Sequence, residues 1–315
     1  MTTPHEDFVG AAAQALATDG QGALATLGWW DLLSDIADVE SRTALFALFQ
    51  AQGRQLVGTP AIGALMAHPY LAALGEQPGA VVMAVPRAHR GGRPASVVIG
   101  EPGGRVLVDV PGTGAWLLGP DEIELRAVSI PGRQVVHEMT MLPPGAPALR
   151  DAAVAGARAR SVFLGRVALA LEMLGAAEGA VSLAIEHACA REQFGRPIAT
   201  FQAVRHLLAW ATTDCTAVDR VAWDAVTLDE AAPPRYGEIT KALAGRNARR
   251  ACERALQVLG AIGFTAEHDH HHFHSRVLAL DALLGTSASL THELGARCRD
   301  EGGTPGLPSA MLLAQ

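Results

Sequence analysis

Lysine is almost missing from this 315-residue chain, and aromatic side chains are scarce as well. Lys241 is the sole lysine among 25 basic residues, so Schiff-base chemistry would depend on that one side chain. Aromatic residues make up 5% of a chain that is 49% hydrophobic, so alanine, leucine and valine must fill most of the core. The net charge of −7 and the lack of a basic tract argue against a nucleic-acid-binding protein.

Targeting signals are also missing from the sequence. The first residues contain no basic segment followed by an apolar core, which argues against a signal peptide. No uncharged apolar run reaches about 18 residues, so no membrane span is expected. The four cysteines form no CxxC pair, and we interpret them as buried free thiols in a reducing compartment. Together these features predict a cytoplasmic protein.

Composition changes twice along the chain and predicts three domains. Residues 1–75 place apolar side chains at helical spacing, which indicates an N-terminal helical domain. Residues 76–145 hold short β-branched runs broken by glycine and proline, typical of a reduced β domain with one small antiparallel sheet. Residues 146–315 are alanine-rich with long helical stretches, so an antiparallel helical bundle is expected there. No predicted strand leads into a glycine loop and a helix, so a Rossmann unit is not supported.

Two joints between helices of the third segment carry the main functional signal. The first, REQFGRPIATFQ, runs from Arg191 to Gln202. It gathers a guanidinium, backbone N–H groups and amide side chains, which suit a pyrophosphate. The second, QVLGAIGF, runs from Gln257 to Phe264, and its two glycines allow a ligand to approach the backbone. Either pattern alone is weak evidence for a binding site. The inference therefore depends on finding both, in this order and at this separation.

In this order the two joints resemble the C-terminal half of the acyl-CoA dehydrogenases, most strongly from about residue 150 to 290. The resemblance implies a mainly helical fold with N-terminal helices, a middle β domain and a C-terminal four-helix bundle. It also implies FAD as cofactor. In that family the two joints reach across a subunit interface to the ADP part of an FAD whose flavin lies in the neighbouring subunit.

The resemblance implies a cofactor contact for each matching residue. Those for the pyrophosphate region are Arg191, Gln193, Phe194 and Gln202. Those for the adenosine side are Gln257, Gly260 and Gly263. Thr286 matches a Gly-Thr-Ser turn near the flavin, with Ala288 where the family usually has an amide.

The departures from the family pattern concern the catalytic base. The family removes the substrate α-proton with a glutamate while flavin N5 takes the β-hydride. That glutamate occupies one of two positions, which by ungapped counting are Leu284 and Gly165 here. Neither residue can accept a proton, so no catalytic residue is assigned. The patterns that cradle the flavin ring in the middle domain are not found either.

One family architecture accounts for these departures. Some bacterial members are α2β2 heterotetramers, notably in β-oxidation of steroid side chains, where a longer subunit supplies the glutamate and flavin pocket. This chain resembles the shortened subunit, so we expect a longer acyl-CoA dehydrogenase as partner and a bulky acyl-CoA as substrate. Two alternatives stay open: a complete homo-oligomeric enzyme with Glu172 as a relocated base, and a scaffold subunit that does not touch FAD.

A run of histidines from His268 to His274 resembles a metal site at first sight. His270 and His274 are one helical turn apart, as zinc ligands can be. No cysteine lies nearby, and the only close carboxylates are Glu267 and Asp269. We therefore expect no physiological metal in this segment.

Overall fold

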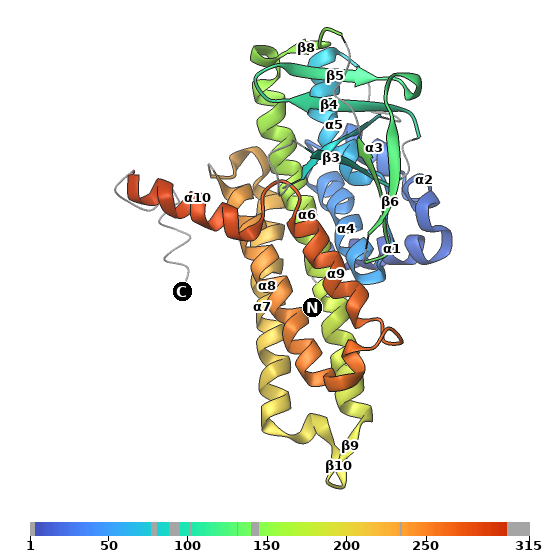
Figure 1. The fold of residues 1–315 in the computed structure, drawn as a ribbon, viewed down its shortest axis with the longest axis vertical. Helices are drawn as coiled ribbons and strands as arrows, with labels where there is room; N and C mark the ends of the chain where they lie inside the picture. The colour runs from blue at the N-terminus through green and yellow to red at the C-terminus, as the bar shows by residue number, and fades with distance from the viewer. Residues whose placement is uncertain are drawn as a thin grey trace.

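The computed structural model describes residues 4–76, 81–87, 95–100, 103–130, 132–139, 145–233 and 235–300. Helices occupy both ends of the described chain, and strands lie between them (Figure 1). This arrangement confirms the predicted fold class, mainly helical with a small β domain. The exact domain boundaries at residues 75/76 and 145/146 stay predictions.

The N-terminal segment forms five α-helices. They are α1 (Pro4–Asp19), α2 (Ala23–Thr26), α3 (Trp29–Ser34), α4 (Val39–Gln55) and α5 (Ala61–Leu74). Asp38 begins α4 as its N-cap, because its carboxylate accepts a hydrogen bond from the Ser41 N–H at 2.9 Å. Gly75 ends α5 in a left-handed conformation, with φ of 72°.

The middle segment contains two four-stranded sheets rather than the single antiparallel sheet that was predicted. One has the order β1-β4-β5-β8 and the other β2-β3-β7-β6. The strands are β1 (Val81–Met83), β2 (Val85–Arg87), β3 (Ala95–Ile99), β4 (Arg105–Val110), β5 (Gly114–Leu118), β6 (Leu125–Ile130), β7 (Gln134–Met139) and β8 (Leu149–Arg150). β1 and β4 are parallel, which also departs from the prediction.

The prediction of a single sheet fails for a local reason at Ala84. The run from Val81 to Val85 looks like one strand in the sequence, but the chain passes from the first sheet to the second at Ala84. Side chains alternate across this crossing. Val82 and Ala84 join a small core between the sheets, whereas Val81 and Val85 join the main core of the molecule.

The C-terminal segment is the helical bundle. Its helices are α6 (Asp151–Ala190), α7 (Gln202–Leu228), α8 (Tyr236–Leu259) and α9 (His270–Asp281), followed by α10 (Ser287–Asp300), which extends to one side (Figure 1). Reciprocal glycines allow α4 and α6 to cross closely. A Cβ on Gly53 would lie 2.1 Å from the Glu172 carbonyl oxygen, and one on Gly175 would lie 2.0 Å from that of Gln50.

Helix α6 is also long and apolar enough, by length and composition, to cross a membrane. Glu172 and Glu178 interrupt the apolar stretch, so the helix contains no uncharged run of about 18 residues, and the expectation of no membrane span stays a prediction. However, 72% of the apolar window is buried inside the protein, as in the core helix of a globular bundle.

The cysteines are free but not uniformly buried, which corrects another expectation. Cys215 and Cys252 are buried, whereas Cys189 is exposed near the end of α6 and Cys298 is half-buried on α10. Burial raises the pKa of the Cys215 thiol, and that of Cys252 to about 12, so both thiols are protonated at neutral pH.

Candidate functional site

The first predicted joint is a small hairpin at the far end of the bundle (Figure 1). It consists of β9 (Glu192–Gln193) and β10 (Arg196–Pro197), which pair antiparallel. The turn residues Phe194 and Gly195 both have positive φ, at 53° and 77°. Positive φ at both central positions is the geometry of a type I′ turn, which is why a glycine is needed here.

The polar groups of this hairpin corner face solvent. Arg191, Gln193 and Gln202 are all exposed. Among the described residues, no carboxylate pairs with the Arg191 guanidinium. The corner itself is held by backbone and ring contacts, because the Arg191 carbonyl accepts a hydrogen bond from Ile198 and the Arg196 guanidinium lies 4.5 Å from the Phe201 ring centroid. Arg191 is thus available for an anion while the backbone below it is fixed.

The second predicted joint is a 3-10 turn, η5 (Gly260–Phe264), between α8 and α9. Gly260 has φ of 64° and ψ of −140°, a conformation that other residues rarely adopt. Gly263 is buried, and a Cβ there would lie 2.8 Å from Leu256 Cδ1. Gln257 is exposed one turn earlier on α8. Glycines are therefore required at this corner by backbone conformation and by packing.

Both corners lie at the same end of the bundle (Figure 1), whereas Thr286 lies between α9 and α10. His187 lies one turn before Arg191 on α6. Burial first, and then the charges of His268 and Arg191, lower the pKa of His187. Thr286 follows the opposite end of α9, where its hydroxyl caps α10 by accepting a hydrogen bond from Ser289 N–H at 3.0 Å. The structure thus brings seven predicted contact residues to one end and separates the eighth.

The two sequence positions for the catalytic glutamate meet in space. A Cβ on Gly165 would lie 2.7 Å from Leu284 Cδ1 and 2.6 Å from Met66 Sδ. Leu284 is only 7% exposed, and the Met66 side chain is fully buried. The convergence supports the alignment of both positions. It also shows that apolar side chains fill the space where a base would act.

The turn after Leu284 is held by charged side chains from α6 and α8. Arg166 donates from Nε to the Leu284 carbonyl at 3.1 Å. Lys241 donates from Nζ to the carbonyls of Asp281 and Gly285, at 3.1 and 3.2 Å. The Asp281 carboxylate in turn accepts the Ser287 N–H at 3.0 Å. The sole lysine is therefore committed to the turn, which leaves no lysine for Schiff-base chemistry.

Glu172 is buried in the bundle, facing Arg276 of α9. Its Oε1 lies 3.1 Å from Arg276 Nε, and both side chains are at most 2% exposed. Burial raises the pKa of the Glu172 carboxyl, and the neighbouring Arg276 charge opposes that shift. Arg276 also donates from Nη2 to the Val57 carbonyl at 2.6 Å. This enclosure suits a structural ion pair more than a base that must reach a substrate.

The histidine run bonds mostly to the backbone. His270 Nε2 lies 2.8 Å from the Cys252 carbonyl oxygen, and His271 Nδ1 lies 2.8 Å from that of His268. Within the described part of the chain, no group of three or more histidine, cysteine or carboxylate side chains has metal-binding geometry.

Exposed apolar side chains at the corner end are a feature that the sequence patterns did not reveal. Phe194 is 93% exposed, Phe264 76% and Trp210 57%, and Ile262 adds a smaller exposed side chain. We call Phe194, Trp210, Ile262 and Phe264 the end patch. Large exposed apolar side chains at one end of a fold can mark an interaction surface. Helical periodicity could not identify the patch because three of its members lie in the turns between helices.

The fold defines a class, that of helix–sheet–helix proteins with a C-terminal four-helix bundle. Residues 158–298 match the family described as "Acyl-CoA dehydrogenase, C-terminal domain". The chain therefore carries an acyl-CoA dehydrogenase C-terminal domain and has the fold of that FAD-dependent oxidoreductase family, which confirms the family predicted from the two joints.

Individual relatives agree with this assignment. The chain is 36% identical over 203 residues to acyl-CoA dehydrogenase FadE34 of Mycobacterium tuberculosis, a match that covers 61% of this chain and 27% of that protein. The chain thus spans about a quarter of FadE34. Among solved structures, the Tcur3481-Tcur3483 steroid ACAD variant has a TM-score of 0.74 and 20% identity, covering 95% of this chain and 98% of that one. The ChsE4-ChsE5 complex from Mycobacterium tuberculosis has a TM-score of 0.71 and 19% identity, covering 97% and 99%.

Proposed function

We propose that the chain is a subunit of a heteromeric, FAD-dependent acyl-CoA dehydrogenase in the cytoplasm. In this proposal it contacts the ADP part of FAD, while a longer partner subunit supplies the catalytic glutamate and the flavin pocket. The observation that carries the proposal is the meeting of Gly165 and Leu284 against Met66. Both positions for the base coincide in space, and neither holds a carboxylate.

The chemistry of the corner residues fits the ADP half of FAD. Arg191 offers a pyrophosphate a guanidinium that pairs with no carboxylate of the described residues, and Gln193 and Gln202 add amide groups that can donate hydrogen bonds. Gly260 leaves open space, because no heavy atom lies within 4 Å of a Cβ built there. Gln257 and Gly263 complete the side assigned to the adenosine. Bound FAD would accept the substrate β-hydride at a flavin ring held by the partner.

Thr286 is the weakest member of the assigned set. Its hydroxyl already bonds to Ser289 N–H and Ser289 Oγ, both at 3.0 Å. Thr286 can therefore shape the turn near Leu284, but it has little capacity left to donate to a flavin. This arrangement agrees with a chain that holds the nucleotide end of FAD and leaves the ring to its partner.

A partner subunit is supported by the end patch and by the solved relatives. Phe194 and Phe264 expose large apolar surfaces beside the corners, and such surfaces are unfavourable unless another chain covers them. Two structures with this fold bear the names of paired proteins, Tcur3481-Tcur3483 and ChsE4-ChsE5. The first of these proteins is named a steroid ACAD, which supports a steroid side-chain acyl-CoA as the substrate class.

The direct test is expression of the chain alone and together with its partner. Alone, it should carry no flavin and show no acyl-CoA dehydrogenase activity. The co-expressed complex should be yellow and active, with about half the FAD per chain that a homotetramer would hold. A flavin-loaded, active homo-oligomer of this chain would refute the proposal.

Substitutions at the first corner separate this proposal from a scaffold that does not touch FAD. Arg191→Gln removes the unpaired guanidinium and should lower the FAD content of the complex. Arg249→Gln is the matched control, because Arg249 is also exposed on the bundle but pairs with Glu253 at 2.6 Å. Equal flavin content in the two variants would favour the scaffold.

A further inference from the structure

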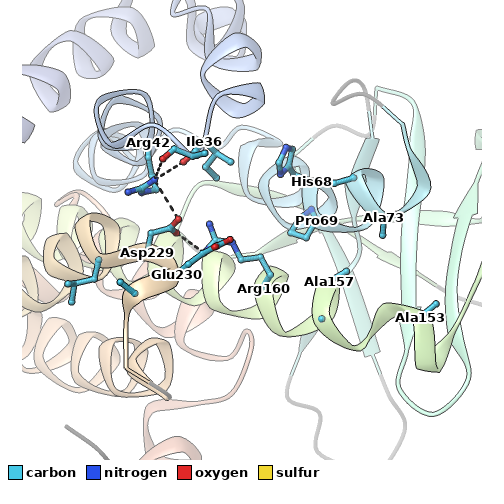
Figure 2. Close-up of a pocket in the computed structure, with 15 residues that line it drawn as sticks. Ile36, Arg42, His68, Pro69, Ala73, Ala153, Ala157, Arg160, Asp229 and Glu230 are labelled. Carbon is cyan, nitrogen blue, oxygen red and sulfur yellow. Dashed lines mark hydrogen bonds and ion pairs between the residues drawn. The ribbon is translucent and has the colours of Figure 1, made fainter. Parts of the chain in front are cut away.

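A cleft of about 580 Å³ opens on the side of α6 that faces away from Arg166. Its walls come from the second half of α5, the first turns of α6, the segment before α4 and the turn after α7, η4 (Asp229–Ala231), as Figure 2 shows. The volume lies within the range of roughly 300–1,000 Å³ that is typical of small-molecule sites. None of the residues assigned to FAD or to the base position lines it.

One wall of the cleft is apolar and built from very small residues. It consists of Ala72, Ala73, Ala153, Gly156 and Ala157. A Cβ on Gly156 would meet no atom within 4 Å, so the space beside this turn of α6 is open. Larger residues at these helical positions would fill the cleft, and the small ones leave room for an apolar ligand body.

The other end of the cleft is charged and centred on Asp229. Asp229 Oδ1 lies 2.6 Å from Arg160 Nη1, and its Oδ2 lies 3.5 Å from Arg42 Nη1 (Figure 2). Asp229 has φ of 49° and ψ of −115°, a conformation that residues with a side chain rarely adopt. The two arginines therefore hold this carboxylate in place against an unfavourable backbone conformation.

Arg42 and Arg160 differ in how many of their guanidinium N–H groups remain without a hydrogen-bond partner among the described residues. Arg42 is buried and donates to the backbone carbonyls of Val226, Ile36 and Ala37 at 2.7–2.9 Å. Within the described chain, the only hydrogen-bonding or ionic partner of Arg160 is Asp229, although its guanidinium carries five N–H groups. Its side chain is 22% exposed in the cleft. Arg160 can thus donate hydrogen bonds to a second anion while it keeps its contact with Asp229.

His68 adds a second polar group to the lining. Its ring makes no hydrogen bond to any residue that the structure describes. Burial, and then the positive charge of Arg160, lower its pKa, so the ring is neutral at pH 7 and offers one donor and one acceptor. Glu230 is exposed, so the enclosed groups are two guanidinium cations and one carboxylate.

We propose that this cleft is a binding site for a small amphipathic carboxylate. The acid group bonds to the remaining donors of Arg160 and to the His68 ring, and the apolar body lies along the small-residue wall of α5 and α6. A single negative charge balances the enclosed cations, and a guanidinium binds a carboxylate through paired hydrogen bonds. The inference does not depend on the proposed dehydrogenase function.

The test is isothermal titration of the full chain, in the assembly in which it purifies, with octanoate, 1-octanol and acetate. Octanoate should bind with one site per chain. Acetate lacks the apolar body and 1-octanol lacks the charge, so both should bind at least tenfold more weakly. Equal binding of octanoate and 1-octanol would overturn the proposal, because no anion site would then be involved.

A matched pair of glycine substitutions locates the site. Gly156→Leu should fill the cleft and weaken octanoate binding at least tenfold while the unfolding temperature is maintained. Gly10→Leu is the control, because Gly10 is also an exposed residue within a helix, with no atom within 4 Å of a built Cβ, and α1 does not line this cleft. If Gly156→Leu binds octanoate as the control does, the ligand lies elsewhere and the proposal is wrong.

Discussion

At the scale of single residues, the buried pair of Glu172 and Arg276 separates a structural role from a catalytic one. Removing one partner of a buried ion pair leaves the other charge uncompensated, which costs about 3–5 kcal/mol. Glu172→Gln should therefore lower the free energy of unfolding by about 3 kcal/mol, measured by urea denaturation. If Glu172 were the base, the same variant would abolish turnover instead.

The outcome is decided by measuring activity and stability in the same complex. We expect the Glu172→Gln complex to retain its turnover per folded molecule at a temperature where it stays assembled. Glu172→Leu combined with Arg276→Met should recover part of the lost stability, because neither charge is then left unpaired. A stable, flavin-loaded complex without turnover would contradict the structural role and favour the homo-oligomeric alternative.

Lys241 gives a second prediction at this scale, through pH. Burial is the main cause that lowers the pKa of Lys241 to about 8, against the smaller opposing effect of Asp281. The unfolded chain keeps an ordinary lysine, so it binds more protons than the folded chain between pH 8 and about 10.4. Stability should therefore rise with pH across this window, by up to about 1.4 kcal/mol per pH unit.

The measurement compares the wild type with Lys241→Met by denaturation at pH 7.5, 8.5 and 9.5. The difference in unfolding free energy should shift in favour of the wild type as the pH rises. Because Lys241 also bonds to the Gly285 carbonyl, the variant should be less stable than the wild type at the highest pH. If the difference in unfolding free energy between the two proteins does not vary with pH, the pKa of Lys241 is not lowered in the folded chain.

At the scale of elements, the crossing of α4 and α6 depends on glycine. A Cβ on Gly175 would lie 2.0 Å from the Gln50 carbonyl oxygen and 2.9 Å from the Arg54 nitrogen, so both contacts are with backbone that cannot rotate away. Gly175→Ala should therefore destabilise the chain by about 3 kcal/mol or more, although alanine favours helices by about 1 kcal/mol.

Gly156 provides the matched control on the same helix. Because Gly156 has no neighbouring atom within 4 Å of a built Cβ, Gly156→Ala should raise the unfolding free energy by about 0.5–1 kcal/mol. If Gly175→Ala lowers the unfolding free energy and Gly156→Ala raises it, the close crossing of α4 and α6 determines the effect, and helix propensity does not. Similar values at the two sites would mean that the helices can separate without cost.

The elements also show what the sequence can and cannot predict. The long helices were predictable because apolar spacing and few breakers act locally. The sequence favours one long helix from Leu149 to near Arg191, and α6 spans Asp151–Ala190. The sheets were not, because pairing partners are set by tertiary contacts. The sequence favours strands at 81–85, 96–99, 106–110 and 123–128, so β5 and β7 were not identified. The parallel pairing of β1 with β4 joins segments that lie far apart in sequence.

At the scale of the whole molecule, the site was predictable only where it lies in turns. The corners at Arg191 and Gly260 carry local signatures of glycine and charge, so they could be identified. The closure of the base position depends on Met66 from α5 meeting Gly165, and one-dimensional spacing does not contain that contact. The end patch and the cleft near Asp229 likewise arise only when several segments fold together.

The last prediction concerns assembly through the end patch. Aromatic side chains that become buried at the centre of an interface can each contribute about 2 kcal/mol or more. Phe194→Asn with Phe264→Ser should therefore weaken binding to the co-purifying partner by at least about tenfold, measured by analytical ultracentrifugation. Asparagine followed by glycine is the favoured type I′ pair, so the hairpin should stay folded.

Val39→Ser is the control, since Val39 is 49% exposed at the start of α4, outside the patch. Unchanged affinity of the double variant would show that the partner binds elsewhere, and the cross-interface contact of the corners with FAD would then lose its support.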